Sequence, residues 1–324
     1  MGARTALAQL LGLQNPILLA PMAGVSGGHL AAAVSRAGGL GLIGGGYGDS
    51  AWLAEQMALC SDVPFGVGFI TWALREQPLL LQQVLAARPR AVMLSFGAIE
   101  EFVAPVRNAG AVLIAQVQTV QQARQAVAHG AQVVVAQGGE AGGHGGLRGT
   151  MALVPAVVDA AGSVPVVAAG GIADGRGLAA ALVLGAGGAL CGTAFVAATE
   201  SLAPERAKRR LCQAGGDDTI KGPVFDLVRG LHWPAGPWQL RTLRNALTDR
   251  WAKDLAGLQA SLPEVQRQYL AAREAGDFDV AATIVGEAAD LVHAVASASD
   301  IVGAMVAQCD ALLAQRRVRS SETH

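Results

Sequence analysis

The sequence predicts an α/β fold in which a (β/α)8 TIM barrel carries an inserted C-terminal helical domain. Two observations predict it: short apolar runs alternate with helix-like segments up to residue 204, and charged side chains become dense from Glu200 onward. The length of 324 residues accommodates a barrel of about 250 residues with an addition. We expect the barrel over residues 1–204, the helical domain over 205–298 and a terminal helix over 299–324 that packs back on the barrel.

Eight apolar runs in the first part of the chain are predicted to be parallel strands. The runs are uninterrupted rather than alternating, which is typical of strands covered on both faces. They occupy residues 17–21, 40–45, 65–70, 91–96, 112–117, 133–138, 164–171 and 189–195. The segments between them have helical patterns, and most end in glycine, as helices do. Eight such units favour a closed barrel over an open doubly wound sheet.

After residue 204 the pattern becomes helical and amphipathic, and no strand pattern competes with it. The stretches are PERAKRRLCQAG, QLRTLRNALTDRWAKDLAGL, PEVQRQYLAARE and DVAATIVGEAADLVHAV. We therefore expect helices alone in the second domain.

Composition narrows the classes of partner. A net charge of −1 and an isoelectric point near 6.6 give no basic surface for nucleic acids or anionic membranes. The apolar run 178–198 is long enough for a membrane span, but the GAGG cluster at 185–188 divides it. We predict neither a nucleic-acid partner nor a membrane segment.

The cysteine pattern predicts neither a disulfide framework nor a metal site. The cysteines are Cys60, Cys191, Cys212 and Cys309. They are far apart and form no CxxC or Cys/His ligand spacing. The opening MGARTALAQLLG lacks the apolar core of a secretory signal, so a cytoplasmic location is expected.

Glycine turns after the seventh and eighth runs predict a phosphate site. In such barrels the loops at the carboxyl ends of strands seven and eight frequently hold a phosphate through backbone N–H groups. The candidates are Gly170, Gly171, Gly192 and Thr193. The alternative is that these residues only permit tight turns. No GxGxxG lies in the loop directly after the first strand, so a Rossmann-type nicotinamide site is not predicted.

His144 follows the sixth run, in the glycine-rich stretch QGGEAGGHGGL, and is the candidate catalytic residue. In a barrel it reaches the same mouth as the phosphate glycines, where a neutral imidazole exchanges protons near pH 7. A structural histidine is the alternative. The loop from Met22 to Gly24 has little side-chain bulk beyond the thioether of Met22, and Gly68 opens further space, so a flat ring has room there. Phe69 and Trp72 are candidate walls of this pocket.

As a set, four motifs resemble the nitronate monooxygenase family, formerly called 2-nitropropane dioxygenases. They are NPILLAPMAGVSGGHLAAAVSRAGGLGLIGGG, AQGGEAGGHGG, AAGGIADGRG and CGTAF. Further similarity in GPVFDLVRGLHWP, LRNALTDRW and GDFDVAATIVGEAADLVH extends it over most of the chain. The resemblance implies an FMN-containing TIM barrel that oxidises alkyl nitronates with O₂ to carbonyl compounds and nitrite. The expected partners are therefore an alkyl nitronate and O₂. A homodimer is a further expectation.

The resemblance also assigns residues. Those matched to flavin contacts are Met22, Ala23, Gln137, Gly142, Gly171, Cys191, Gly192 and Thr193. His144 matches the family histidine beside the flavin, placed to act on the acidic C–H of the substrate or to hold its nitro group. Family members often carry an amide side chain where this chain has Gly68. The substrate pocket does not transfer, because neither Tyr47 nor Tyr269 can be placed at the substrate from sequence.

Other activities on the same flavin barrel stay open. Quinone reductases and flavin-dependent enoyl-acyl carrier protein reductases, both supplied by NAD(P)H, share the barrel, and the latter share a similar EAGGH loop. Residues 1–207 contain no lysine, which weighs against lysine-bearing quinone reductases. A noncatalytic barrel that binds a phosphate ligand is the third alternative.

Overall fold

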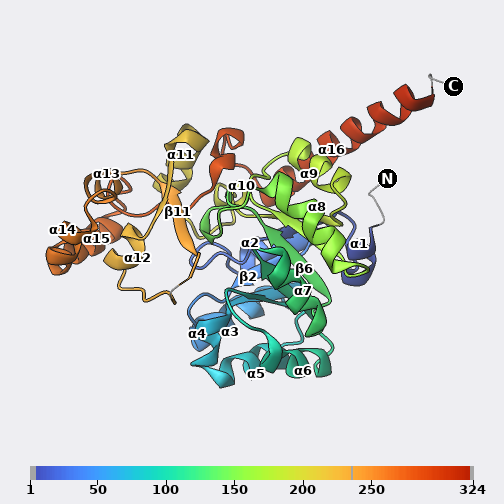
Figure 1. Cartoon of the computed structure of the whole chain (residues 1–324), viewed down its shortest axis with the longest axis horizontal. Coiled ribbons are helices and arrows are strands. Elements are labelled where there is room, and N and C mark those ends of the chain that lie inside the picture. Colours follow the sequence, from blue (N-terminus) through green and yellow to red (C-terminus); the bar gives the residue numbers. More distant parts are fainter. Residues whose placement is uncertain (1–4, 235, 322–324) are drawn as a thin grey trace.

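The computed structural model of the chain describes residues 5–234 and 236–321, with side chains up to residue 315. In this part, eight parallel strands form one sheet in the order β1-β9-β8-β6-β5-β4-β3-β2. Figure 1 shows β2 and β6 of this sheet in the centre of the barrel, with helices around them. Leu18 of β1 bridges Leu40, the residue before β2, in parallel and so closes the barrel. The TIM barrel and its eight strands are confirmed, except that the eighth run is a strand only up to Cys191 and becomes helical from Thr193. The strands are β1 (Ile17–Leu19), β2 (Gly41–Gly44), β3 (Phe65–Ile70), β4 (Ala91–Ser95), β5 (Val112–Val117), β6 (Val133–Gln137), β8 (Val166–Ala169) and β9 (Gly188–Cys191).

Helices alternate with these strands, and most of them cover the outside of the barrel. Leu7 and Leu11 of the first helix instead join the core inside the barrel. The helices are α1 (Ala6–Leu11), α2 (Gly28–Arg36), α3 (Ser50–Ala58), α4 (Thr71–Arg75), α5 (Pro78–Ala86), α6 (Glu100–Asn108), α7 (Val120–Ala128), α8 (Thr150–Ala161), α9 (Gly175–Val183) and α10 (Thr193–Val196). Helix α7 shows why they begin where they do. The Thr119 side chain accepts the Gln122 N–H while the Gln122 side chain accepts the Thr119 N–H, which satisfies two backbone donors at the helix start.

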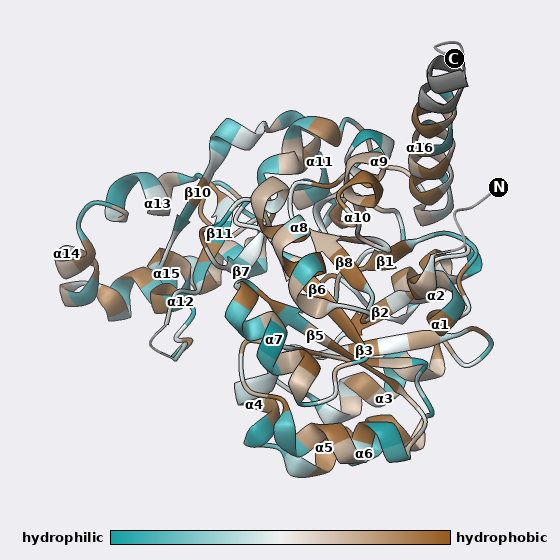
Figure 2. Cartoon of the chain, turned by 45° about the vertical axis from the view of Figure 1, so that its right-hand side comes forward, coloured by the Kyte–Doolittle hydropathy of each residue, from teal (hydrophilic) through white to brown (hydrophobic). Residues whose placement is uncertain are grey.

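Each barrel strand is buried on both faces. Leu18, Leu42 and Met93 belong to the core inside the barrel, whereas their neighbours Leu19 and Ile43 belong to the core between sheet and helices. Figure 2 shows the strands as a hydrophobic centre. This double burial explains why the apolar runs in the sequence do not alternate.

After the barrel the chain forms a lobe beside it (Figure 1). Its elements are α11 (Glu205–Gln213), η1 (Gly216–Asp218), β10 (Thr219–Gly222), α12 (Val224–Val228), β11 (Gln239–Leu243), α13 (Ala246–Trp251), α14 (Leu255–Ala260), α15 (Leu262–Ala275) and η2 (Glu287–Leu291). The expectation of helices alone was wrong here. Strands β10 and β11 pair antiparallel, and β11 also pairs with β7 (Gly143–Gly145) from the sixth barrel loop. These strands are short, so their residues merged into the neighbouring helical patterns.

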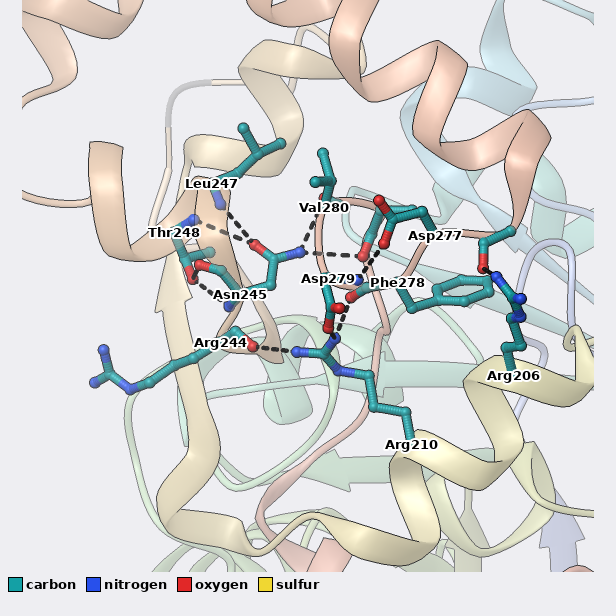
Figure 3. Close-up of polar contacts among 12 residues, drawn as sticks. Arg206, Arg210, Arg244, Asn245, Leu247, Thr248, Asp277, Phe278, Asp279 and Val280 are labelled. Carbon is teal, nitrogen blue, oxygen red and sulfur yellow. Dashed lines mark hydrogen bonds and ion pairs between the residues drawn. The ribbon is translucent and has the colours of Figure 1, made fainter.

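Arg210 of α11 links three segments of the lobe. Its guanidinium donates to the carbonyl oxygens of Phe278 and Arg244 and pairs with Asp279 at 2.7 Å (Figure 3). Asn245 caps α13, and its amide donates 2.9 Å to the Val280 oxygen. The lobe is therefore held together by side chains that bond to backbone as well as by its own apolar core.

The last helix, α16 (Ala298–Ser321), packs against α9 and α2 of the barrel. The Gln308 side-chain oxygen accepts the Gly175 N–H at 2.7 Å. A Cβ on Gly175 would lie 2.4 Å from the Met305 carbonyl oxygen, so this glycine permits the close approach of the two helices. Among the described residues, none of the helices has the length and apolar character needed to span a membrane.

Candidate active site

The loops at the carboxyl ends of the barrel strands enclose a cavity that brings most of the predicted site residues together. Those lining it are Met22, Ala23, Gly68, Gln137, Gly142, His144, Gly170, Gly171, Gly192 and Thr193. Cys191 is the exception. Its side chain lies in the core between sheet and helices, where burial raises the pKa of the thiol to about 12. Any contact of Cys191 with a ligand must come from its backbone.

Two of the lining glycines are required by close approach of the protein to itself. A Cβ on Gly68 would lie 2.2 Å from Cγ of Pro21. A Cβ on Gly142 would lie 2.4 Å from the carbonyl carbon of Val285, in the segment that precedes η2. Gly68 therefore lets the first and third loops meet. Gly142 lets the lobe lie over the sixth loop.

The seventh and eighth loops present backbone to the cavity. Gly170 and Gly171 have φ of 96° and 73°, the left-handed region that favours glycine. Gly192 precedes the four-residue helix α10, which begins at Thr193. The first N–H groups of a helix have no acceptor within it and can bind an anion. Here the Phe195 N–H donates to the Gly192 carbonyl oxygen at 2.9 Å, so the groups concerned are those of Thr193 and Ala194. The Thr193 hydroxyl accepts the Gly286 N–H at 2.9 Å, which ties this end of the cavity to the lobe.

Gln137 fixes the floor of the sixth loop. Its side-chain oxygen accepts from the amides of Gln118 at 2.9 Å and Gln116 at 3.1 Å. Its own amide donates to the His144 carbonyl oxygen at 3.0 Å. Because every bond is internal to the protein, the side chain holds the histidine loop in place while it lines the cavity.

His144 is buried and belongs to β7, where it is paired with Leu240 of β11. Its Nε2 lies 2.9 and 3.0 Å from the two carboxylate oxygens of Asp226 in α12. A carboxylate only accepts, so Nε2 carries the proton and Nδ1 keeps its lone pair in the neutral ring. Burial lowers the pKa of His144, while the hydrogen bond and charge of Asp226 raise it. The net lowering favours a neutral imidazole at pH 7.

Five aromatic side chains, hereafter the aromatic cluster, form a connected group that contacts His144 through Phe96 and Trp233. They are Tyr47, Trp72, Phe96, Trp233 and Trp238. The Trp233 indole stacks on the imidazole with a centroid distance of 3.4 Å and an interplanar angle of 17°. Tyr47, Phe96 and Trp233 line the cavity. The Tyr47 hydroxyl accepts from Trp233 Nε1 at 3.0 Å, and burial raises the pKa of Tyr47.

Phe96 has a φ of 65°, which is rare for a residue with a Cβ. Such a backbone costs roughly 1–3 kcal/mol and persists where surrounding structure imposes it. Here it follows β4 and directs an aromatic ring into contact with Trp233 at 5.0 Å and His144 at 6.3 Å between centroids. The strain coincides with the cavity, as functional sites often show.

A model of the nitronate monooxygenase family matches residues 4–79 and 76–308. The chain belongs to the nitronate monooxygenase family. The resemblance carried by the motifs is thereby confirmed, as is the expectation of an oxidoreductase of this family.

Individual relatives of the family are similar over most or part of the chain. Nitronate monooxygenase npaC of Metarhizium robertsii is 36% identical, covering 93% of this chain and 92% of the relative. The (3aS,4S,5R,7aS)-5-hydroxy-7a-methyl-1-oxo-octahydro-1H-indene-4-carboxyl-CoA dehydrogenase of Mycobacterium tuberculosis is 37% identical over 68% of this chain, which spans 63% of that protein's length. Among solved structures, FabK from Thermotoga maritima matches with a TM-score of 0.83 at 30% identity, over 98% of this chain and 99% of that one.

Sequence reasoning missed Asp226 and could not place Tyr47. Asp226 lies in the family-like stretch GPVFDLVRGLHWP, but no local spacing relates it to a histidine 82 residues earlier. The long-range pairing of β11 with β7 carries the lobe to the histidine loop, and neither short strand had been predicted. The similarity of that stretch to the family was the one available signal that the lobe contributes to the site.

Proposed function

We propose that the chain is an FMN-dependent nitronate monooxygenase that oxidises alkyl nitronates with O₂ to carbonyl compounds and nitrite. The observation that carries the proposal is the His144–Asp226 pair at the same cavity as the glycine turns after strands β8 and β9. Family membership and the arrangement of a proton-transfer group opposite a phosphate-type backbone site support it.

The residues at the cavity fit FMN. Gly170, Gly171 and the start of α10 offer backbone N–H groups suited to its phosphate. Met22 and Ala23 in the first loop and Gly68 in the third leave a low, apolar surface for its ring. FMN, when bound, supplies the electron acceptor for oxidation of the nitronate and passes the electrons to O₂.

The protein's own part in the reaction is to hold the substrate anion and to move a proton. The Nδ1 lone pair of His144 takes a proton from the acidic C–H of a nitro compound, and the Asp226 carboxylate stabilises the resulting imidazolium. The protonated ring then holds the negative charge of the nitronate. The aromatic cluster and Leu240 restrict water around this pair, which strengthens the electrostatic attraction.

The second candidate is a reductase that takes electrons from NAD(P)H and reduces quinones or enoyl-acyl carrier proteins. One observation supports retaining this candidate. The absence of lysine before residue 208 had weighed against lysine-bearing quinone reductases. Lys221 of β10, however, donates from Nζ to the Gly146 carbonyl oxygen, two residues after His144. Burial lowers the pKa of Lys221 to about 8. A lysine from the lobe thus reaches the sixth loop, and the composition of the barrel alone does not exclude a reductase.

An anaerobic absorbance titration separates these candidates. The purified protein is expected to be yellow, and its flavin absorbance should bleach with a nitronate but hardly with NADH. Bleaching by NADH alone would support the reductase instead. A colourless protein that FMN cannot reconstitute would support the third candidate, a noncatalytic barrel for a phosphate ligand.

The variant His144→Ala tests the assigned role of the imidazole. Backbone groups are proposed to hold the cofactor, so the variant should retain its flavin while nitronate turnover falls by about a hundredfold or more. Loss of flavin with unchanged turnover per bound flavin would contradict the assignment. We also propose a cytoplasmic location and a homodimer; sedimentation velocity at several protein concentrations tests the assembly.

A further inference from the structure

Arg229 is a cation that the proposed reaction has not used. It lies at the end of α12, one turn after Asp226, and lines the cavity together with Tyr47, His144 and Trp233. Within the described residues it forms no ion pair, and the Asp226 carboxylate is already engaged by His144. A partly buried guanidinium without an anionic partner is costly unless a ligand supplies the anion.

The charge of Arg229 acts on two titratable side chains of the cavity, His144 and Tyr47. The charges of Arg229 and Lys221 both act to lower the pKa of His144, although burial and the opposing effects of Asp226 are larger. Arg229 also acts to lower the pKa of Tyr47, against the larger effect of burial. Asp226 is the acidic group that opposes these cations at the imidazole. Of the two cations, Arg229 is the one that lines the cavity.

The surroundings of Arg229 are unusually aromatic for this chain. The sequence contains 7 Phe, 5 Trp and 2 Tyr. Tyr47, Phe96 and Trp233 line the cavity, and Trp72 and Trp238 pack against them from outside its lining. Phe96 and Trp233 meet edge-on at 5.0 Å with an interplanar angle of 78°, and Trp72 meets Trp233 at 78° as well. Rings at right angles form walls against which a flat apolar group packs on several sides.

We infer that the site takes substrates in which a delocalised anion is attached to a bulky planar hydrophobic group, with Arg229 binding the anion and the rings of Tyr47, Phe96 and Trp233 packing against the hydrophobic group. The inference rests on the proposed function and names its substrate class as aryl-bearing nitronates. A small alkyl nitronate would satisfy Arg229 but leave the aromatic walls unfilled, so it would lose the affinity gained from burying apolar surface.

Binding of unreactive analogues tests this without turnover. Benzoate shares the planar, delocalised charge of an aryl nitronate; acetate keeps only the anion, and benzamide only the ring. Isothermal titration calorimetry on the flavin-loaded protein should show benzoate binding at least about tenfold more tightly than either, because charge-assisted bonds and ring burial each contribute about that factor. Acetate binding as tightly as benzoate would overturn the inference.

Variants assign the two parts of the site. Arg229→Gln should weaken benzoate binding by about tenfold or more while benzamide binding stays unchanged, and Arg229→Lys should restore part of the loss. Trp233→Leu should weaken benzoate more than acetate. Arg124→Gln, at an exposed position on α7, is the matched control and should change neither. Unchanged benzoate affinity in Arg229→Gln would overturn the role of Arg229.

Steady-state oxygen consumption then separates this inference from the proposed function. The kcat/KM of the phenylnitromethane anion should exceed that of propyl-2-nitronate by about tenfold or more. In Arg229→Gln, the phenylnitromethane anion should lose most of the kcat/KM advantage that it has over neutral phenylnitromethane in the wild type. Oxidation of both nitronates with equal kcat/KM would leave the proposed function standing and overturn the inference. Benzoate binding that depends on Arg229, without oxidation of either nitronate, would refute the proposed function and support the anion site.

Discussion

The Nε2 atom of His144 lies 2.9 Å from a carboxylate oxygen of Asp226, although 82 residues separate them in the sequence. The histidine belongs to a barrel loop and the aspartate to the lobe, which meet because β7 pairs with β11. The candidate active site is therefore complete only when the lobe docks on the barrel mouth. This arrangement couples proton transfer at the imidazole to the integrity of a small sheet.

Asp226→Asn should shift the acidic limb of the pH–activity profile downward. Burial already lowers the pKa of His144, and the hydrogen bond and charge of Asp226 oppose that lowering. An amide still accepts the Nε2 proton but carries no charge, so the pKa of His144 should fall further. We expect kcat/KM above the limb to fall by about tenfold to a hundredfold, because the imidazolium loses its stabilising charge. An unmoved limb, or one that moves to higher pH, would contradict the pairing.

The barrel could be predicted from sequence because every strand is buried on both faces. Runs such as VVVAQG contain inward residues like Val135 and outward residues like Val134, so both faces select apolar side chains. The same reasoning failed for β10 and β11. Arg241 and Lys221 on these strands face partners in the sixth loop, so the two strands lack the continuous apolar character that reveals a barrel strand.

The candidate site was predictable to the extent that its residues come from barrel loops. The position of His144 and of the glycines follows from the rule that loops at the carboxyl ends of strands share one mouth. Asp226 and Arg229 come from the lobe, and Tyr47 from a loop without a pattern of its own. Their positions depend on long-range packing, which no spacing in the sequence encodes.

Lys221→Met should stabilise the protein relative to wild type at pH 7 and lose that advantage as pH rises. The pKa of Lys221 is about 8 in the folded chain against 10.5 for an ordinary lysine, chiefly through burial. Between these values the unfolded chain binds more protons, so this lysine's contribution to folding stability increases with pH. The stability difference, measured by urea unfolding from pH 7 to 10.5, should therefore shrink. Lys253→Met, at an exposed position, should show no such trend.

Gly68→Ala should destabilise the barrel mouth. The added Cβ would lie 2.2 Å from Cγ of Pro21, whose ring cannot rotate away, so the first loop must shift. Overpacking of this kind costs about 1–3 kcal/mol in the free energy of unfolding, and flavin content should fall with it. Gly303→Ala is the control, since nothing lies within 4 Å of its Cβ and it sits in α16. That control should gain about 0.5–1 kcal/mol, and an equal response of both variants would refute the steric explanation.

Thr193→Val should loosen the contact between the barrel and the segment before η2. The Thr193 hydroxyl accepts the Gly286 N–H at 2.9 Å in a buried position, and valine would leave that donor without a partner. The expected cost is about 1–3 kcal/mol in unfolding free energy. Thr193→Ser keeps the hydroxyl and should recover most of it. Hydrogen exchange reports the effect directly: the Gly286 amide should exchange faster in the valine variant than in wild type or the serine variant. If it exchanges equally slowly in all three proteins, the hydroxyl does not hold this segment, and the link between α10 and the lobe depends on packing of Val285 against Gly142 instead.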